Sequence, residues 1–378
     1  MNEQQLHLFR RSTRLERDAN SAGLSTYIPT PRGIELVGQL LDTLASNDYK
    51  AFSITGPYGS GKSSFAVFLT ALFEARKSDA YQAGIKLLEA ESDSVSSSLK
   101  VTRDRFGVAE SGFVVIRVTS QRAPLLSILL EALISALHQV SDIDGLQEQI
   151  ESIVASEQLE EKDLVRAIRL ICLHRPVLLC IDEFGKALEW FSEHKSRKGD
   201  LYILQQLIEK SESRTHKPFA LVTLQHLAFD EYAADAAPLR QREWAKIQGR
   251  FRDFPFSDSS QTTGFLMTRC LERLQLPHPA AANLVWQKAR EFHLVDSLGL
   301  NIKKLSPLHP LTAVLLPELC SKYGQHERSL FRFLSSTDDQ SLQWIIQNEQ
   351  LVDGWIMPWH LYDYFLASAG STSALPSL

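Results

Sequence analysis

Two kinds of apolar pattern alternate along residues 33–224 and predict helices and strands in turn. Apolar side chains at helical spacing fill 33–45, 64–73, 125–140, 146–155 and 161–173. Short runs rich in apolar and β-branched residues lie at 51–55, 112–119, 176–181 and 219–224. Because a strand that is buried on both faces is apolar without interruption, these runs predict a parallel sheet with helices on both sides. The expected fold class is α/β, with a parallel αβα core.

The pattern changes along the chain and predicts its domain organisation. Residues 1–30 are charged and polar, which favours an N-terminal arm or linker. The core is expected over 31–258, with the polar stretch 76–111 as an insertion that contains a mobile loop. Only helical patterns occur over 259–368, at 264–274, 279–292, 310–323 and 341–348, and they predict an all-helical lid domain. The polar tail 369–378 is typical of a linker and favours a fragment of a longer protein.

A glycine-rich run lies between the first strand and the helix that follows it, and it fits the phosphate-binding loop pattern G-x-x-x-x-G-K-[ST] without departure. In this pattern glycines let backbone N–H groups converge on phosphates, the lysine reaches the β- and γ-phosphates, and the next hydroxyl ligates Mg²⁺. A glycine-rich turn without nucleotide is the alternative, but the flanking strand and helix favour the nucleotide. The sequence therefore predicts a P-loop NTPase core that binds a nucleoside triphosphate and Mg²⁺ through Gly56, Pro57, Tyr58, Gly59, Ser60, Gly61, Lys62, Ser63 and Ser64.

Two carboxylates follow the apolar run 176–181, in a Walker B pattern. The carboxyl end of a strand in an open parallel sheet is where ligands bind. Asp182 is predicted to hold the Mg²⁺ together with Ser63. Glu183 is predicted to polarise the water that attacks the γ-phosphate, with Lys62 as a second catalytic residue. The alternative for the acidic pair is a solvated strand end.

The overall composition is that of an ordinary globular protein. Hydrophobic residues make up 44% of the 378 residues and charged residues 22%, which fits two or three domains. A net charge of −5 leaves nucleic-acid binding possible through local patches but unsupported. Four scattered cysteines without zinc-site spacing, a polar N-terminus and apolar stretches too short to span a membrane predict a cytoplasmic protein.

An αβα nucleotide domain with a helical lid resembles the AAA+ superfamily and its STAND relatives. The resemblance implies ATP as the nucleotide, hydrolysis to ADP and phosphate, and a homo-oligomer that forms on ATP binding. It also implies that Gln225, after the strand 219–224, senses the γ-phosphate; a strand-capping amide is the alternative. The run from Gln241 to Phe256 is similar to the region that carries an arginine finger, with Arg250 as the first candidate and Arg252 as the second. A surface arginine in a salt bridge is the alternative for both.

Two lid motifs extend the resemblance. Residues 308–313 are similar to a proline-containing motif that lies against the nucleotide, which implies a contact from Pro310, although a helix start explains this proline equally well. Arg328, in 325–331, is implied to be a second sensor. With 182–186 and 361–365, these motifs resemble the ATPase module of large proteins in bacterial phage-defence islands, including those of BREX-type systems. The resemblance covers roughly residues 20–368 and implies protein partners in a defence complex. Because such proteins are usually much larger, any effector is expected outside this chain.

Several functions are consistent with these residues. The leading one is an ATP-hydrolysing switch or motor that assembles with copies of itself in antiviral defence. The second is a nucleotide-gated scaffold or sensor that hydrolyses slowly and recruits an effector. A DNA-loading ATPase requires a basic reading head, which is not recognisable here, and a small-molecule kinase requires acceptor-site residues, which are not apparent either.

Overall fold

The computed structural model describes most of the chain, and the described residues are 13–46, 51–155, 160–193, 202–209, 217–228, 231–232, 245–256, 260–274, 276–298, 302–323 and 327–369. The chain divides into two compact units. The first contains residues 13–57 and 62–256, and the second contains the residues after 256. The loop 58–61 does not belong to the first unit, although it joins a strand and a helix of that unit. The start of the predicted arm, the tail after 369, Gln241 to Trp244 and residues 325–326 lie outside the described residues.

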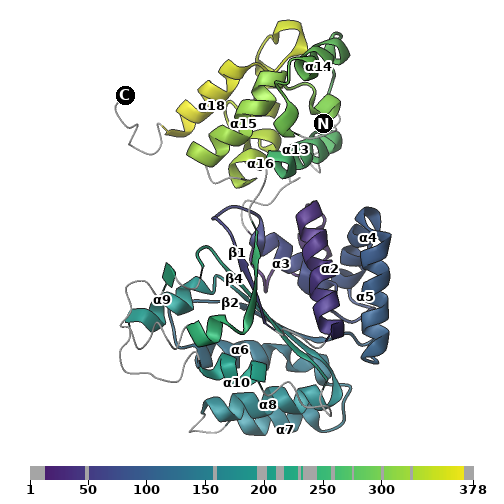
Figure 1. The fold of residues 1–378 in the computed structure, drawn as a ribbon, viewed down its shortest axis with the longest axis vertical. Coiled ribbons are helices and arrows are strands. Elements are labelled where there is room, and N and C mark those ends of the chain that lie inside the picture. The colour runs from purple at the N-terminus through teal and green to yellow at the C-terminus, as the bar shows by residue number, and fades with distance from the viewer. Residues whose placement is uncertain are drawn as a thin grey trace. The chain divides into compact units, whose positions relative to one another are not determined.

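A five-stranded parallel sheet forms the centre of the first unit (Figure 1), which confirms the predicted fold class. Its strands are β1 (Ala51–Thr55), β2 (Val114–Thr119), β3 (Val177–Asp182), β4 (Phe219–Gln225) and β5 (Phe251–Pro255). Their order is β2-β3-β4-β1-β5, and every neighbouring pair is parallel. All five carboxyl ends therefore lie along one edge of the sheet. The sequence did not predict β5, because only two of its five side chains are buried and its residues do not form an apolar run.

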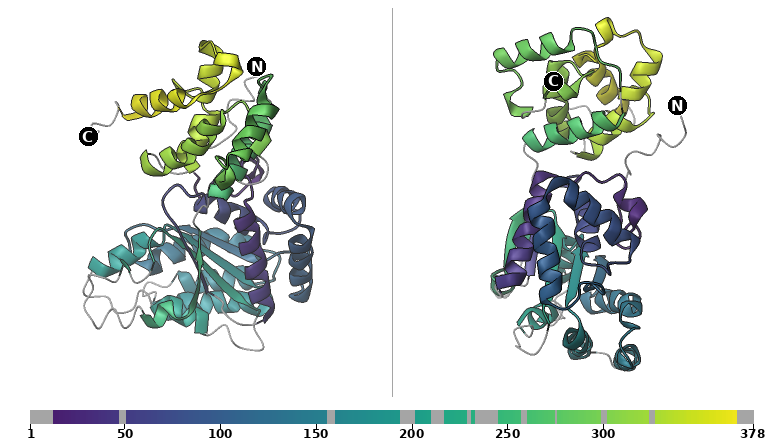
Figure 2. Two further views of the ribbon diagram at one scale, coloured as in Figure 1. Left: turned by 45° about the horizontal axis from the view of Figure 1, so that its top comes forward. Right: turned by 90° about the vertical axis from the view of Figure 1, so that its right-hand side faces the viewer.

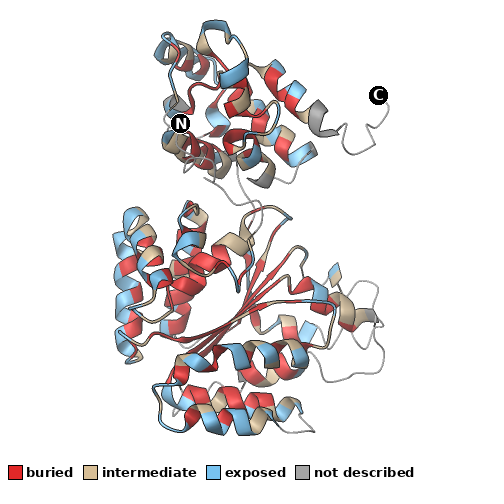
Figure 3. Cartoon of the chain, turned by 180° about the vertical axis from the view of Figure 1, so that it is seen from behind, coloured by how far each residue is buried: buried red, intermediate tan, exposed pale blue. Residues whose placement is uncertain are grey.

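Alternate residues of each strand face two separate cores, as β3 shows. Val177, Leu179 and Ile181 pack against the helices on one face, and Leu178 and Cys180 pack against those on the other. The first face carries α6 (Leu125–Ala136), the 3₁₀ turn η2 (Leu137–Val140), α7 (Leu146–Val154), α8 (Glu161–His174), α9 (Gly185–Glu193) and α10 (Tyr202–Glu209). The second face carries α1 (Ser21–Leu24), α2 (Pro31–Ser46), α3 (Lys62–Ala71), α4 (Asp79–Glu91) and α5 (Asp93–Arg105). The central strands β3 and β4 are accordingly buried at every position (Figure 3).

The prediction of a loop within 76–111 was wrong for most of this stretch, because it forms the helices α4 and α5 (Figure 2). Two serines begin them: the Ser78 hydroxyl accepts a hydrogen bond from the Tyr81 N–H at 3.0 Å, and Ser92 caps α5 in the same way. Leu88 and Leu99 are fully buried and anchor the pair to the core. Serine is common in loops, but at a helix N-cap it stabilises the helix, so the serine-rich composition gave the wrong structure here.

Part of the predicted arm or linker belongs to the first unit. Residues 13–30 lie within it, and Leu15 and Leu24 are almost completely buried. The Asp18 carboxylate is also buried and accepts hydrogen bonds from the backbone of Arg14 and the guanidinium of Arg17. Residues 13–30, which the sequence predicted as an arm or linker, therefore pack against the core.

The second unit is helical in its described parts, as predicted, apart from a single bridge between Leu308 and Ile356. Its helices are α13 (Ser260–Leu274), α14 (Ala282–Glu291), α15 (Pro310–Tyr323), α16 (Glu327–Ser335), α17 (Leu342–Asn348) and α18 (Pro358–Ala369), with 3₁₀ turns η4 (Asp296–Leu298), η5 (Ile302–Leu305) and η6 (Val352–Gly354). Trp286 and Phe333 are among its fully buried side chains. Within the described ranges, no helix of either unit is both long and apolar enough to cross a membrane.

Candidate nucleotide site

The glycine-rich loop joins the carboxyl end of β1 to the first residue of α3. Gly59 and Gly61 have φ angles of 79° and 77°, in the left-handed region that glycine enters without steric cost. The Gly56 N–H donates to the Gln225 carbonyl at 3.2 Å, which ties the start of the loop to β4. Lys62 Nζ donates to the carbonyls of Gly56 and Pro57, both at 2.7 Å, so its ammonium lies over the loop. The loop is therefore a tight turn between β1 and α3 that depends on its two left-handed glycines.

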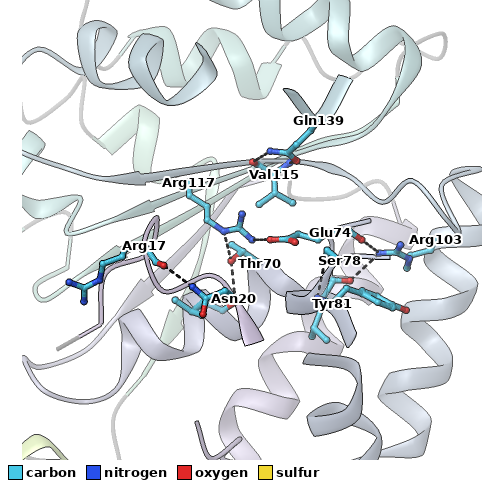
Figure 4. Close-up of polar contacts among 12 residues, drawn as sticks. Arg17, Asn20, Thr70, Glu74, Ser78, Tyr81, Arg103, Val115, Arg117 and Gln139 are labelled. Atoms are coloured by element: carbon cyan, nitrogen blue, oxygen red, sulfur yellow. Dashed lines mark hydrogen bonds and ion pairs between the residues drawn. The ribbon is translucent and has the colours of Figure 1, made fainter. Parts of the chain in front are cut away.

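Two arginines hold the far end of α3 in place (Figure 4). Arg103 Nη1 donates to the carbonyls of Leu72 and Glu74, at 3.2 and 2.8 Å. Arg117, from β2, donates to the Thr70 hydroxyl at 3.0 Å and forms an ion pair with the Glu74 carboxylate. Cations at a helix C-terminus satisfy carbonyls that the helix cannot. These contacts fix the helix whose first residue is Lys62.

Asp182 ends β3, and only 4% of its surface is exposed. Its Oδ1 accepts a hydrogen bond from the Glu183 N–H at 2.8 Å, and its carboxylate also accepts one from the Ser63 side chain. Burial raises the pKa of Asp182 above its ordinary value, and these two hydrogen bonds act in the opposite direction. The predicted metal ligands Ser63 and Asp182 are thus in contact. A hydroxyl and a carboxylate suit Mg²⁺, which keeps several water or phosphate oxygens as its other ligands.

No larger metal cluster competes with this pair. In the part of the chain that the structure describes, no group of three or more His, Cys, Asp or Glu side chains could hold a metal ion. All four cysteines are buried and free of disulfides, and burial raises the pKa of Cys270 to about 12. The cysteines are therefore thiols within the packed interior.

Glu183 leaves the strand in an unusual backbone conformation. Its φ is 51°, a left-handed value that is uncommon for a residue with a side chain and clusters at functional sites. The side chain is 40% exposed and its carboxylate forms an ion pair with Lys186, one helical turn further on. The Phe184 N–H donates to the Leu224 carbonyl at 2.9 Å, which returns the backbone to β4. Glu183 therefore lies at the carboxyl end of β3, in a turn that a hydrogen bond to β4 holds in place.

Gln225 ends β4, and its side-chain amide is buried without a hydrogen-bond partner in the described part of the chain. Only 2% of its surface is exposed, and among the described residues neither Oε1 nor Nε2 has a hydrogen-bond partner. A buried polar group without a partner is rare and costly. A strand-capping amide would bond to nearby backbone, so the structure disfavours that alternative. Because β4 lies between β1 and β3, this amide stands between the two Walker motifs.

The first candidate finger arginine, Arg250, lies at the opposite end of β5 from the loop, and Arg252 lies opposite Phe52 within the paired strands. β5 pairs with β1 so that Phe251 is opposite Ala51 and Pro255 is opposite Thr55. Arg250 precedes that register and Gly56 follows it, which separates them by roughly 20 Å at about 3.3 Å per residue. Arg250 Nη1 donates to the Lys246 carbonyl at 2.7 Å. Arg250 is therefore too far from the phosphate-binding loop of its own chain to contact it.

Arg252 is engaged within the first unit. Its Nη1 donates to the Thr43 hydroxyl of α2 at 3.1 Å, and its guanidinium lies 5.2 Å from the centre of the Phe254 ring. Both arginines therefore have hydrogen-bond partners within their own unit, and the choice between them as the arginine finger stays a prediction.

The lid candidates belong to the second unit. Pro310 is the first residue of α15, which fits a helix start, and the Leu311 N–H donates to His309 Nδ1 at 3.3 Å. Arg328 lies in α16, and its side chain is outside the described part of the structure. The nucleotide contacts implied for Pro310 and Arg328 stay predictions.

Sequence reasoning missed three residues that border the site, Thr13, Glu16 and Thr119. The Glu16 carboxylate accepts hydrogen bonds from the backbone N–H and the hydroxyl of Thr119, the latter at 2.7 Å. Thr119 ends β2 directly opposite Asp182 in the strand register. Nearby, the hydroxyls of Thr13 and Ser64 are 3.0 Å apart. No local pattern reveals these contacts, because Glu16 and Thr119 are 103 positions apart in the chain.

Comparisons with known proteins give a likeness of shape only. No protein-family model matches the chain, and no curated protein matches it in sequence. The ORC1 protein of Aeropyrum pernix, solved in complex with DNA, is 12% identical, with a TM-score of 0.40 over 95% of this chain and 70% of that one. Two structures of the ORC2 protein of Aeropyrum pernix are also similar. The form with ADPNP and ADP is 14% identical, with a TM-score of 0.43 over 88% of this chain and 72% of that one. The ADP form is 13% identical, with a TM-score of 0.44 over 93% and 71%. Because all three TM-scores are below 0.5, the fold described above rests on the strand order and the loop.

Proposed function

We propose that this chain binds ATP with Mg²⁺ at the carboxyl edge of its sheet and hydrolyses it to ADP and phosphate. The observation that carries the proposal is the unpartnered Gln225 amide, buried between the strand of the phosphate-binding loop and the strand of Asp182. Its Nε2 donor would be satisfied by a phosphate oxygen, and burial makes such a hydrogen bond stronger than in water. Further support is that polar residues suited to bind a nucleotide end the neighbouring strands β3 and β4.

Each residue has a distinct part in this proposal. Lys62 exchanges the carbonyls of Gly56 and Pro57 for the β- and γ-phosphate oxygens, while loop N–H groups donate to the same phosphates. Ser63 and Asp182 would hold the Mg²⁺, which supplies positive charge to the phosphates. Glu183 orients the attacking water and accepts its proton. Gln225 donates to the γ-phosphate.

Turnover by single-site variants tests this proposal directly. Lys62→Ala should abolish tight binding of a fluorescent ATP analogue, because the loop loses its ammonium. Glu183→Gln should retain the binding and stop phosphate release. Wild-type turnover in the Glu183→Gln protein would remove this carboxylate from the reaction, and an absence of any nucleotide binding by the wild-type chain would refute the whole proposal.

We further propose that the protein is an AAA+ or STAND ATPase that assembles with copies of itself. The first support is the resemblance of the motifs. The second is that Arg250 lies before the amino end of β5, far from its own phosphate-binding loop at the carboxyl end of β1. An arginine in that position can complete a site only in another subunit. Trans-acting arginines of this kind increase phosphoryl transfer by several orders of magnitude, which would make turnover dependent on assembly.

A nucleotide-gated scaffold or sensor with slow hydrolysis is the second candidate, and the ion pair between Glu183 and Lys186 favours it. A carboxylate that is paired with an ammonium is less available to water. Single-turnover measurements separate the two readings, because a gated scaffold should bind ATP at a stoichiometry of about one and release phosphate slowly at every protein concentration.

The defence role and the DNA-loading role each depend on partner molecules besides this chain. The motif resemblance supports the first role. Phage plating on cells that carry the intact locus, with wild type and Lys62→Ala compared, tests the first role. Stimulation of turnover by duplex DNA tests the second, and a rate that DNA leaves unchanged argues against it.

A further inference from the structure

Tyr232 makes an unusually close contact with the start of α9. Gly185 is the first residue of this helix and lies two positions after Glu183. A methyl group added at Gly185 would overlap the Tyr232 hydroxyl and lie 2.7 Å from ring atom Cζ. Only glycine therefore allows the tyrosine to approach the backbone of the turn in this way. The ring also packs against the core on the α6 to α10 face of the sheet.

The Tyr232 hydroxyl is held from the other side by His226. It shares a hydrogen bond of 2.8 Å with His226 Nδ1, and the two rings meet edge to face with centroids 5.4 Å apart. His226 directly follows Gln225, the residue with the unpartnered buried amide. The contacts thus run from the end of β4 through His226 and Tyr232 to the turn that presents Glu183.

Burial favours the neutral imidazole of His226, against three neighbouring carboxylates that favour the protonated ring. Burial lowers the pKa of His226, and the nearby charges that act on it are Glu189, Lys62, Glu231 and Glu183. A neutral ring can either accept from the tyrosine hydroxyl or donate to it, so the hydrogen bond persists at neutral pH.

We propose that Tyr232 is a positioning residue for hydrolysis, which fixes the Glu183 turn against Gly185 and couples it through His226 to the γ-phosphate sensor Gln225. This inference rests on the proposed ATPase function. Glu183 itself has a left-handed backbone, so small changes at Gly185 alter the direction of its carboxylate. A change of this kind alters the rate of the chemical step and leaves the phosphate-binding loop unchanged.

The first test is a set of steady-state measurements on the full chain with two variants. Tyr232→Phe removes the hydroxyl and keeps the ring, and it should lower kcat roughly fivefold with the KM for ATP within about twofold of wild type. Tyr202→Phe is the matched control, because this tyrosine of α10 is 48% exposed, and its kcat should equal that of wild type. Binding of a fluorescent non-hydrolysable ATP analogue should be unchanged in both.

A double-mutant cycle tests the contact with Gly185. Gly185→Ala should lower kcat by about tenfold or more in the wild-type background, since the added methyl group displaces Tyr232 or the turn. The same substitution in a Tyr232→Ala background should cost much less, because the ring that it meets is absent. A purely structural role would lower the melting temperature of all these variants without this rescue and without a selective loss of kcat.

Two results would overturn the inference while the proposed ATPase function stands. The first is a wild-type kcat in Tyr232→Phe, and the second is an equal effect of Gly185→Ala in both backgrounds. A wild-type chain that binds ATP without turnover refutes hydrolysis instead, and the inference about Tyr232 is then refuted with it.

Discussion

The carboxylate of Glu183 forms an ion pair with Lys186, one turn away at the start of α9. Both side chains are partly exposed, at 40% and 48%, so water screens the pair and its strength is modest. The pair nevertheless occupies the carboxylate that is proposed to activate water.

We predict that Lys186→Met increases ATP turnover. Loss of the ammonium releases the Glu183 carboxylate, and an exposed pair of this kind corresponds to a rate increase of about twofold. Initial rates of phosphate release at saturating Mg²⁺ and ATP give the result. Lys186→Arg is the control that keeps the charge and should retain the wild-type rate. A lower rate in Lys186→Met would mean that the lysine assists the reaction.

We predict that Gln225→Met stabilises the protein without nucleotide and lowers its activity. Replacement of a buried, unpartnered amide by an apolar side chain of similar size removes a desolvation cost of about 1 kcal/mol or more, so the free energy of unfolding should rise. Turnover should fall by about 10²-fold, because a buried donor to the γ-phosphate is lost. Chemical unfolding and steady-state kinetics on the same samples measure both effects.

Thr223→Val is the contrasting variant, two residues earlier in β4. Its hydroxyl is also fully buried, but it donates to the Phe52 carbonyl at 3.4 Å. Its removal should lower the free energy of unfolding by about 1 kcal/mol. If Gln225→Met also destabilised the protein, the amide would have to contact a partner outside the described residues.

We predict that Arg250 acts on a neighbouring subunit and that Arg252 does not. Arg250→Ala should abolish the part of the specific activity that increases with protein concentration, whereas Arg252→Ala should lose only its contact with Thr43. Mixing provides a sharper test: Lys62→Ala subunits keep the arginine, and Arg250→Ala subunits keep the loop. Activity in the mixture, with both variants inactive alone, would establish the trans arrangement. An inactive mixture that still assembles by light scattering would contradict it.

We predict that Asp182→Asn stabilises the protein without nucleotide at neutral pH and has no such effect in acid. Burial raises the pKa of Asp182 in the folded state above its ordinary value of 3.8. The folded state therefore holds this proton more tightly, and the free energy of unfolding falls as the pH rises above 3.8. The asparagine variant lacks this term. Unfolding curves at pH 7 and at about pH 3.5 should show a gain only at the higher pH. An equal gain at both values would assign the effect to packing.

The glycine-rich loop and its position between a strand and a helix could be predicted from the sequence, because the pattern is local. Phosphate binding depends on glycines, a lysine and a hydroxyl at fixed spacing, and the chain from Gly56 to Ser63 contains all of them. The strands 51–55 and 219–224 were also predicted within one residue of their bounds, since fully buried strands are apolar throughout. The sequence did not predict the edge strand β5 or the helices of 76–111, because their composition is not typical of their structure. A half-exposed strand and a serine-capped helix lack the composition that marks their class.

The sequence by itself determined four of the five strands, the glycine-rich loop and the pair Asp182 and Glu183 at a strand end, because each is encoded by neighbouring residues. Only the tertiary structure decided the strand order, and with it the position of Gln225 between the two motifs and of Arg250 at the opposite edge. It also brought Glu16 to Thr119 and Tyr232 to Gly185. Such contacts depend on which strands pair and which side chains meet across the fold. No periodicity in one segment encodes them, because the partners are distant in the chain and are joined only by packing.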